Sequence, residues 1–311
     1  MNIINTYSHI KSVFDTEHFN LDKWKSYIDK CVPGAKELCI DDMRDCLDAG
    51  YSWQKNFLPT LDYVKDNSAL CKEIIQSFQI VTNTLDERII KVFNRTVNAN
   101  VILYIGLCNG AGWVTEINGI TTVLLGIEKI LELGWGNIDD MTGLIVHELG
   151  HVYQSQYGVL DEKTDSFSDR FLWQMFTEGV AMVFEQKVVG NDEYFHQDKN
   201  GWKSWCDSNK EMIKQSFFED LLTMTDKNQR YFGDWVRFEG YGDVGYYLGT
   251  MFVKFLLQSD DFDNVIGYSL SKVKYEYSRF MDFKNHKTMI TTAACHFFRE
   301  RRGKKSLFPI A

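Results

Sequence analysis

The sequence has little proline and no internal repeat or low-complexity segment. Only three of its 311 residues are proline, and no composition typical of collagen or of disordered chains is present. Basic residues are also in deficit, 34 against 43 acidic ones, and the formal charge of −9 argues against a general binder of nucleic-acid phosphates. At 44% hydrophobic and 14% aromatic residues, the chain can bury a large core, so we expect a compact globule without a nucleic-acid partner.

Long apolar runs and paired cysteines are missing as well. The first eleven residues show no basic segment followed by an apolar one, and residues 244–257, the most apolar late stretch, contain Lys254 and fall short of the ~20 residues of a membrane span. We therefore expect a cytoplasmic protein with no membrane partner. The seven cysteines are scattered without a CxxC pair, which favours reduced, mostly buried thiols over disulfides or a thiolate zinc site.

The hydrophobic pattern changes twice along the chain. It is mostly helical up to residue 97, turns to short β-prone runs at 101–107 and 121–127 around a glycine-rich segment, and becomes helical again after Gly136. This order predicts an α+β fold rather than alternating βαβ units. The expected regions are a helical N-terminal region over 1–97, a small mixed sheet with one helix over 98–160, and a mostly helical lobe over 161–311. The later helices are expected at 138–157, 168–188, 198–216 and 243–258.

The most informative motif is His147-Glu148-Leu149-Gly150-His151, an HExxH match. On a helix, two histidines four residues apart project from one face and can bind a single cation, with Glu148 beside them. A chance match in a shuffled chain of this composition is expected about 0.01 times. The alternative is a buried helix whose histidines bond to backbone carbonyls, and metal binding is the favoured interpretation.

The flanking sequence supplies the helix that this geometry requires. Asn137 can cap its N-terminus, and Asp139 and Asp140 lie in the first turn, where the helix dipole favours acids. An apolar stripe then follows with helical spacing. Its members are Met141, Leu144, Ile145, Leu149 and Val152.

A catalytic zinc site needs a third protein ligand from another element. Glu178 lies in an apolar stretch that Ser168 could cap and Gly190 could end, and Gly179 beside it would let two helix backbones approach closely. Glu185, two turns further along the same face, is the rival ligand or a partner for a histidine behind the metal. We expect Glu178 to be the ligand, because a carboxylate on an apolar face is otherwise costly to bury.

These residues resemble the gluzincin metallopeptidases, the group that includes the thermolysin and aminopeptidase N types. That group places HExxH on one helix and a glutamate on the next. Residues 177–181, Thr-Glu-Gly-Val-Ala, are similar to the Asn-Glu-Gly-x-Ala stretch of the aminopeptidase branch, and residues 245–249, Gly-Tyr-Tyr-Leu-Gly, resemble its Tyr-x-x-Gly segment. The combination is also similar to a bacterial family of predicted zinc-dependent proteases. The resemblance covers about residues 100–258, but the exopeptidase motif Gly-x-Met-Glu-Asn is absent before HExxH.

The resemblance implies a zincin-like catalytic core holding one Zn²⁺ ion. By it, Tyr246 would donate a hydrogen bond to the oxyanion, with Tyr247 as the less favoured donor. The alternative is that these tyrosines only pack, because they lie beside or within a core stripe over residues 244–255. An edge strand would pair with an extended substrate, and the best candidate in the sequence is residues 121–127. His196 is expected on the surface, and the basic tail over 299–305 is expected to be a solvated terminus.

The sequence thus predicts a zinc-dependent peptidase acting on a peptide or protein. Glu148 would be the general base that takes a proton from the attacking water and passes it to the leaving amine. Two other functions share these residues: a catalytically silent, metal-binding regulatory protein on a zincin scaffold, and a hydrolase of a non-peptide amide. Substrate specificity, exo- or endopeptidase action and oligomeric state stay open at the sequence level.

Overall fold

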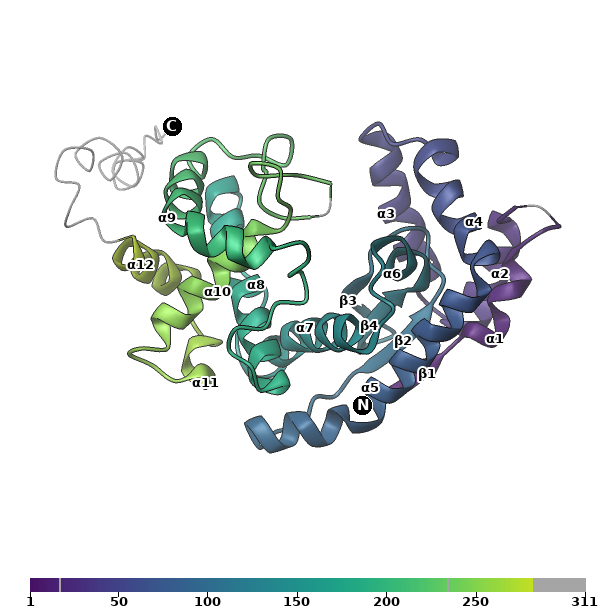
Figure 1. The fold of residues 1–311 in the computed structure, drawn as a ribbon, viewed down its shortest axis with the longest axis horizontal. Helices are drawn as coiled ribbons and strands as arrows, with labels where there is room; N and C mark the ends of the chain where they lie inside the picture. Colours follow the sequence, from purple (N-terminus) through teal and green to yellow (C-terminus); the bar gives the residue numbers. More distant parts are fainter. Residues whose placement is uncertain (17, 234, 282–311) are drawn as a thin grey trace, which may run out of the picture.

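The chain begins with a strand, in a region that the sequence predicted to be mostly helical. The computed structural model describes residues 1–16, 18–233 and 235–281 (Figure 1). Strand β1 (Asn2–Asn5) pairs in parallel with β2 (Asn100–Tyr104), so the N-terminal region contributes to the sheet. The rest of that region is helical, as expected. Its elements are α1 (Tyr7–Ile10), the 3₁₀ turn η1 (Lys11–Val13), α2 (Leu21–Cys31), α3 (Lys36–Asp48), the π-helical turn η2 (Trp53–Phe57), α4 (Leu58–Asp66) and α5 (Ser68–Phe93).

The sheet has four strands in the order β1-β2-β4-β3. Strand β4 (Ile120–Gly126) runs parallel to β2 and antiparallel to β3 (Gly112–Ile117). The turn between β3 and β4 is Asn118-Gly119, both with positive φ, as a two-residue hairpin with right-handed strand twist requires. Residues 121–127, predicted as the edge strand, therefore fall on an inner strand, and the edge next to it is β3.

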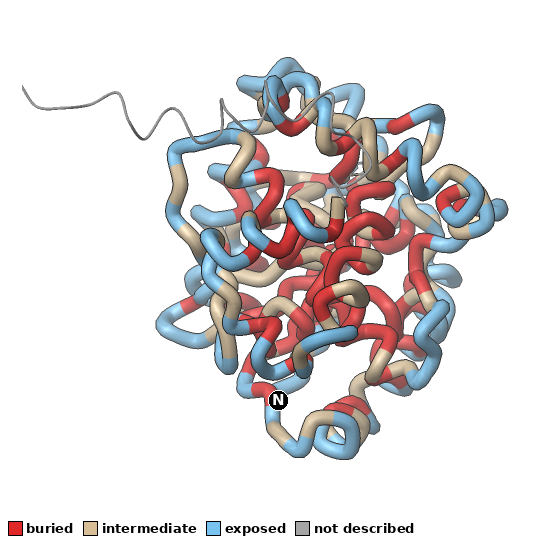
Figure 2. The backbone as a smooth tube through the Cα atoms, turned by 90° about the vertical axis from the view of Figure 1, so that its left-hand side faces the viewer, coloured by how far each residue is buried: buried red, intermediate tan, exposed pale blue. Residues whose placement is uncertain are grey.

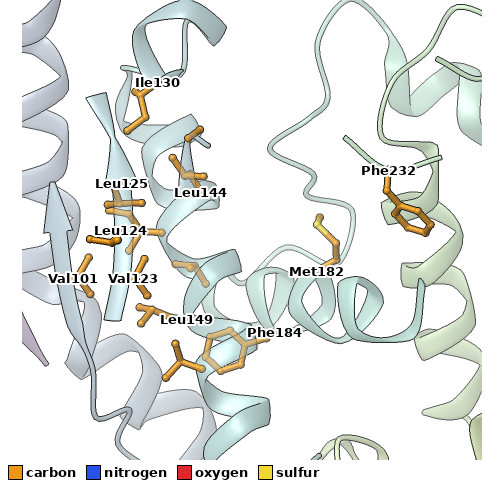
Figure 3. Packing of buried hydrophobic residues seen from close by; sticks show 14 of the residues in the cluster. Val101, Val123, Leu124, Leu125, Ile130, Leu144, Leu149, Met182, Phe184 and Phe232 are labelled. Carbon is orange, nitrogen blue, oxygen red and sulfur yellow. The ribbon is translucent and has the colours of Figure 1, made fainter. Parts of the chain in front are cut away.

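The inner strands form because their residues are apolar on both faces. Most side chains of β2 and β4 are fully buried, which is the pattern of strands covered on both sides. Helix α7 (Ile138–Tyr157) covers one face: it packs against β3 and β4, and Figure 3 shows its Leu144 and Leu149 next to β4. Asn137 caps α7 by accepting a hydrogen bond from the Asp140 N–H at 2.9 Å. The predicted cap and helix bounds are confirmed.

Helix α8 (Phe167–Val189) packs between α7 and α10 (Val244–Leu256). Its cap is Ser166, two residues before the predicted Ser168, and it ends at Gly190 as expected. A methyl group on Gly179 would lie 2.2 Å from the carbonyl oxygen of Gly249, so glycine lets these two backbones touch. The predicted close approach at Gly179 is confirmed, and it brings α10 within reach of the residues on α7.

The remaining helices surround this stack. They are α6 (Ile127–Leu133), α9 (Trp202–Asp220), α11 (Phe262–Val265) and α12 (Leu270–Phe280). Helices α2 to α4 lie on the right of Figure 1 beyond the sheet, and α8 to α12 lie on the left, with α7 between them; α5 runs from the right along the lower edge of the view toward the lower left. Buried residues run through the centre of the molecule in Figure 2, and the core cluster includes residues from all three predicted regions.

Among the described residues, no helix has both the length and the apolar character needed to cross a bilayer. The six cysteines of the described ranges are free thiols, in line with the prediction of reduced cysteines. The predicted basic tail over 299–305 lies outside the described residues, as do His286 and His296. The observed helices and small mixed sheet are compatible with the predicted α+β class.

Candidate metal centre

Three side chains from α7 and α8 converge on one point. Oε2 of Glu178 lies 3.1 Å from Nε2 of His147 and 3.3 Å from Nε2 of His151. In a tetrahedral zinc site with bonds of ~2.0–2.1 Å, neighbouring ligand atoms lie about 3.3 Å apart. The two imidazole nitrogens and the carboxylate oxygen therefore fit a single zinc ion in both type and spacing.

The electrostatics of this group favour a cation. Burial alone would lower the pKa of His147, but its hydrogen bond to Glu178 and the nearby carboxylate of Glu185 raise that pKa well above the ordinary value. Burial would raise the pKa of Glu178, but the charge of His151 and the hydrogen bond to His147 hold it far below its usual range. The carboxylate is thus anionic and stabilises positive charge next to the imidazoles.

Glu148 lies beside this group, buried between α7 and the edge strand. A Cβ atom on Gly112 of β3 would come within 2.8 Å of Cγ and Oε1 of Glu148, so the missing side chain leaves the space that the carboxyl group occupies. Burial raises the pKa of Glu148, opposed by the charges of His147 and His151. A raised pKa makes the ionised carboxylate a stronger base, which favours a group that accepts a proton and later returns it.

The two rival carboxylates occupy different sides of His147. Glu178 faces the Nε2 atoms, whereas Oε2 of Glu185 lies 3.6 Å from Nδ1 of His147, on the opposite edge of the ring. Glu185 is fully buried and accepts from Nδ1 of His196 at 2.9 Å. Glu178 therefore faces both histidines of the HExxH motif, whereas Glu185 lies behind His147. With His147 and His196, Glu185 forms a second group whose ligand atoms lie close enough together to hold an ion.

The two neighbouring tyrosines also have different surroundings. The ring of Tyr246 lies 5.5 Å from the ring of His147, centroid to centroid. Tyr247 is buried and donates its hydroxyl hydrogen to Oδ1 of Asp207 at 2.8 Å. Tyr246 is therefore next to the candidate metal centre, and the hydroxyl of Tyr247 is engaged at the α9 side.

No family model, curated protein or solved structure matches the chain significantly. The resemblance to the gluzincins therefore stays a prediction that rests on the motif residues of this chain. The interpretation of the site depends on its own chemistry.

His196 is the residue that the sequence analysis placed wrongly. It was expected on the surface, but it is 6% exposed, and its ring lies 5.5 Å from that of His147. Space for it comes from Gly143 of α7, because a Cβ there would lie 2.3 Å from Cβ of His196. A glycine one turn before His147 and the aromatic Phe195 beside His196 are the signals that could have indicated its burial.

Proposed function

We propose that this protein is a zinc-dependent peptidase with a zincin-like catalytic core. One observation carries the proposal: Nε2 of His147, Nε2 of His151 and Oε2 of Glu178 converge at ligand spacing, with the Glu148 carboxyl group beside them. The packing of α7 on a small mixed sheet supports the zincin interpretation, because that arrangement presents one helix face below an edge strand.

Each residue has a role that its surroundings support. One Zn²⁺ ion would be held by His147, His151 and Glu178. As a Lewis acid, the ion would lower the pKa of a water molecule toward neutral pH. Glu148 would accept the proton of the attacking water and donate it to the leaving amine. Tyr246 would donate a hydrogen bond to the developing oxyanion without adding a charge.

The free edge of β3 supports an extended peptide or protein as the substrate. Gly126 donates its N–H to the carbonyl oxygen of Ala111, so in the alternating antiparallel ladder the next outward-facing N–H groups belong to Gly112 and Val114. Among the described strands, β3 has a neighbour on one side only. A peptide could add to this edge by main-chain hydrogen bonds, with its scissile bond near Glu148.

The test combines metal analysis with cleavage of an unbiased peptide library. We expect one zinc ion per chain and cleavage by the wild-type protein. Glu148→Gln should keep the zinc and lose about 10²–10⁴-fold in turnover, because the variant lacks the general base. Glu211→Gln is the matched control, since it makes the same carboxylate-to-amide change at an exposed position of α9 and should leave turnover unchanged.

Three results would contradict the proposal. Unchanged turnover in Glu148→Gln would remove the assigned base. Stoichiometric zinc with no cleavage of any peptide would favour the silent metal-binding protein. Hydrolysis of non-peptide amides alone would favour the third function.

A further inference from the structure

Behind the candidate metal centre, a second buried group links His147, Glu185 and His196. It joins three segments: α7, the C-terminal part of α8, and the loop that follows α8. The proposed mechanism uses only the Nε2 side of His147. The opposite edge of that ring, which carries Nδ1, faces Glu185.

The contacts of Glu185 are directional. Nδ1 of His196 lies 2.9 Å from Oε2 and 3.1 Å from Oε1 of Glu185. An ionised carboxylate can only accept, so Nδ1 of His196 must carry the hydrogen and donate it. Oε2 of Glu185 is also the carboxylate oxygen closest to Nδ1 of His147, at 3.6 Å. Glu185 is 0% exposed, so a carboxylate there needs these partners to offset its lost hydration.

Nδ1 of His147 makes no hydrogen bond in the structure although it is fully buried. At 3.6 Å its distance to Glu185 exceeds that of a hydrogen bond, and a small movement of either side chain closes it. With hydrogen on Nδ1, His147 presents the lone pair of Nε2 toward Glu178 and His151, which is the form that binds a metal.

His196 also separates Glu185 from water. Its ring is packed edge-on against Trp135, with centroids 5.3 Å apart, and it lines a cavity of about 940 Å³ between α5, the start of α7 and the loop after α8. Glu185 does not line that cavity. Loss of the His196 ring would therefore open a path from the cavity to the carboxylate.

We infer that His196 is a positioning residue: it fixes Glu185, and Glu185 fixes the tautomer and orientation of the ligand His147. The inference rests on the proposed function, because it assumes that His147 binds zinc through Nε2. It assigns to a loop histidine a role in metal affinity rather than in contact with substrate.

The test compares His196→Ala with His196→Asn. The asparagine amide nitrogen falls at the place of Nδ1 and can still donate to Glu185, whereas alanine cannot. We expect the zinc dissociation constant, measured by competition with a chelator, to rise about 10–100-fold in His196→Ala and to return most of the way in His196→Asn. His18→Ala is the control. The His18 side chain is exposed, and its partner is Asp62, so it contacts none of the residues of the metal centre.

Two further measurements separate positioning from general loss of structure. ¹⁵N NMR of the zinc-loaded protein should show His147 with hydrogen on Nδ1 in the wild type and in His196→Asn, and Co²⁺-substituted protein should show a changed visible spectrum only in His196→Ala. Thermal unfolding without metal shows whether each variant is folded. If His196→Ala is not folded, the zinc affinity of His196→Asn and the tautomer of His147 in the wild-type protein test the inference instead.

The outcomes are distinct. Wild-type zinc affinity in a folded His196→Ala, or equal weakening in both variants, would overturn the inference while leaving the proposed function intact. Hydrogen on Nε2 of His147 in the zinc-loaded protein would contradict the inference and the proposed ligand set together, because Nε2 could not then bind the ion. Two zinc ions per chain, one of them lost in His196→Ala, would also overturn the inference, because the group behind His147 would then be a second metal site. A wild-type protein that binds no zinc would overturn both proposals.

Discussion

Two adjacent tyrosines at the start of α10 have different neighbours, and we expect different roles for them. Tyr246 lies next to His147, and Tyr247 bonds to Asp207. We predict that Tyr246→Phe lowers kcat about 10²–10³-fold with zinc content unchanged, because one donor to the oxyanion is lost. Tyr247→Phe is the matched control: it should cost about 1 kcal/mol in unfolding free energy and leave kcat unchanged. Equal losses of kcat in the two variants would contradict the assignment.

Glu128 is a buried carboxyl group that the sequence analysis did not single out. It is 0% exposed, and its Oε1 accepts from the backbone N–H groups of Gly106 and Cys108, both at 3.1 Å. Burial raises its pKa to about 7, opposed by these backbone hydrogen bonds. The bonds hold the segment that leads from β2 toward the edge strand.

The raised pKa of Glu128 predicts how the stability of the protein changes with pH. Between the ordinary pKa of 4.5 and the folded value of about 7, the folded protein binds more protons at Glu128 than the unfolded chain does, so this group lowers stability as pH rises. Glu128→Gln keeps an oxygen that can accept from Gly106 and Cys108 but does not titrate. In urea unfolding between pH 4.5 and pH 8, the variant should gain up to about 3 kcal/mol relative to the wild type. Parallel pH profiles would show that Glu128 does not titrate in this range.

At the scale of elements, local signals predicted the helices well. Asn137 and the acidic first turn gave the start of α7, and the apolar stripe gave its length, because capping and amphipathic spacing are encoded within a few residues. The histidine pair and Glu178 could be predicted for the same reason: helix geometry fixes which residues share a face.

Features that depend on distant partners could not be predicted in this way. Strand β1 has only four residues, and it exists because Asn2 to Asn5 pair with residues 98 positions away. Strand order has the same origin, so the edge was assigned to residues 121–127 instead of β3. His196 was missed because a loop residue's burial depends on what packs against it, here Gly143 and Trp135.

The free edge of β3 is where we expect an extended substrate to bind. Val114→Pro removes one outward N–H, and proline is tolerated at an edge where that N–H has no partner in the sheet. If substrate adds to β3, KM for peptides should rise about tenfold while zinc content stays constant. Val114→Ala keeps the N–H and is the control for the lost side chain. Equal KM values for the two variants would show that peptides do not bind along this edge.

At the scale of the whole molecule, the candidate metal centre joins two parts of the fold. His147 and His151 lie on α7, which packs on the sheet, and Glu178 lies on α8, which packs on α10. A single ion bound by these residues would connect the sheet side to the C-terminal helices. Because unfolding would separate the ligands, binding free energy adds to the stability of the folded chain.

Zinc should therefore raise the thermal midpoint of the whole protein. At a free zinc concentration 100 times the dissociation constant, one site adds about 2.7 kcal/mol, or roughly 4 °C for a chain of this length. A chelator should reverse the shift. Glu148→Gln should keep it, since Glu148 is not assigned as a ligand, and Glu178→Gln should lose most of it. An unchanged zinc-dependent shift in Glu178→Gln, measured by calorimetry, would show that the ion is held elsewhere and that the convergence of α7 and α8 is not its site.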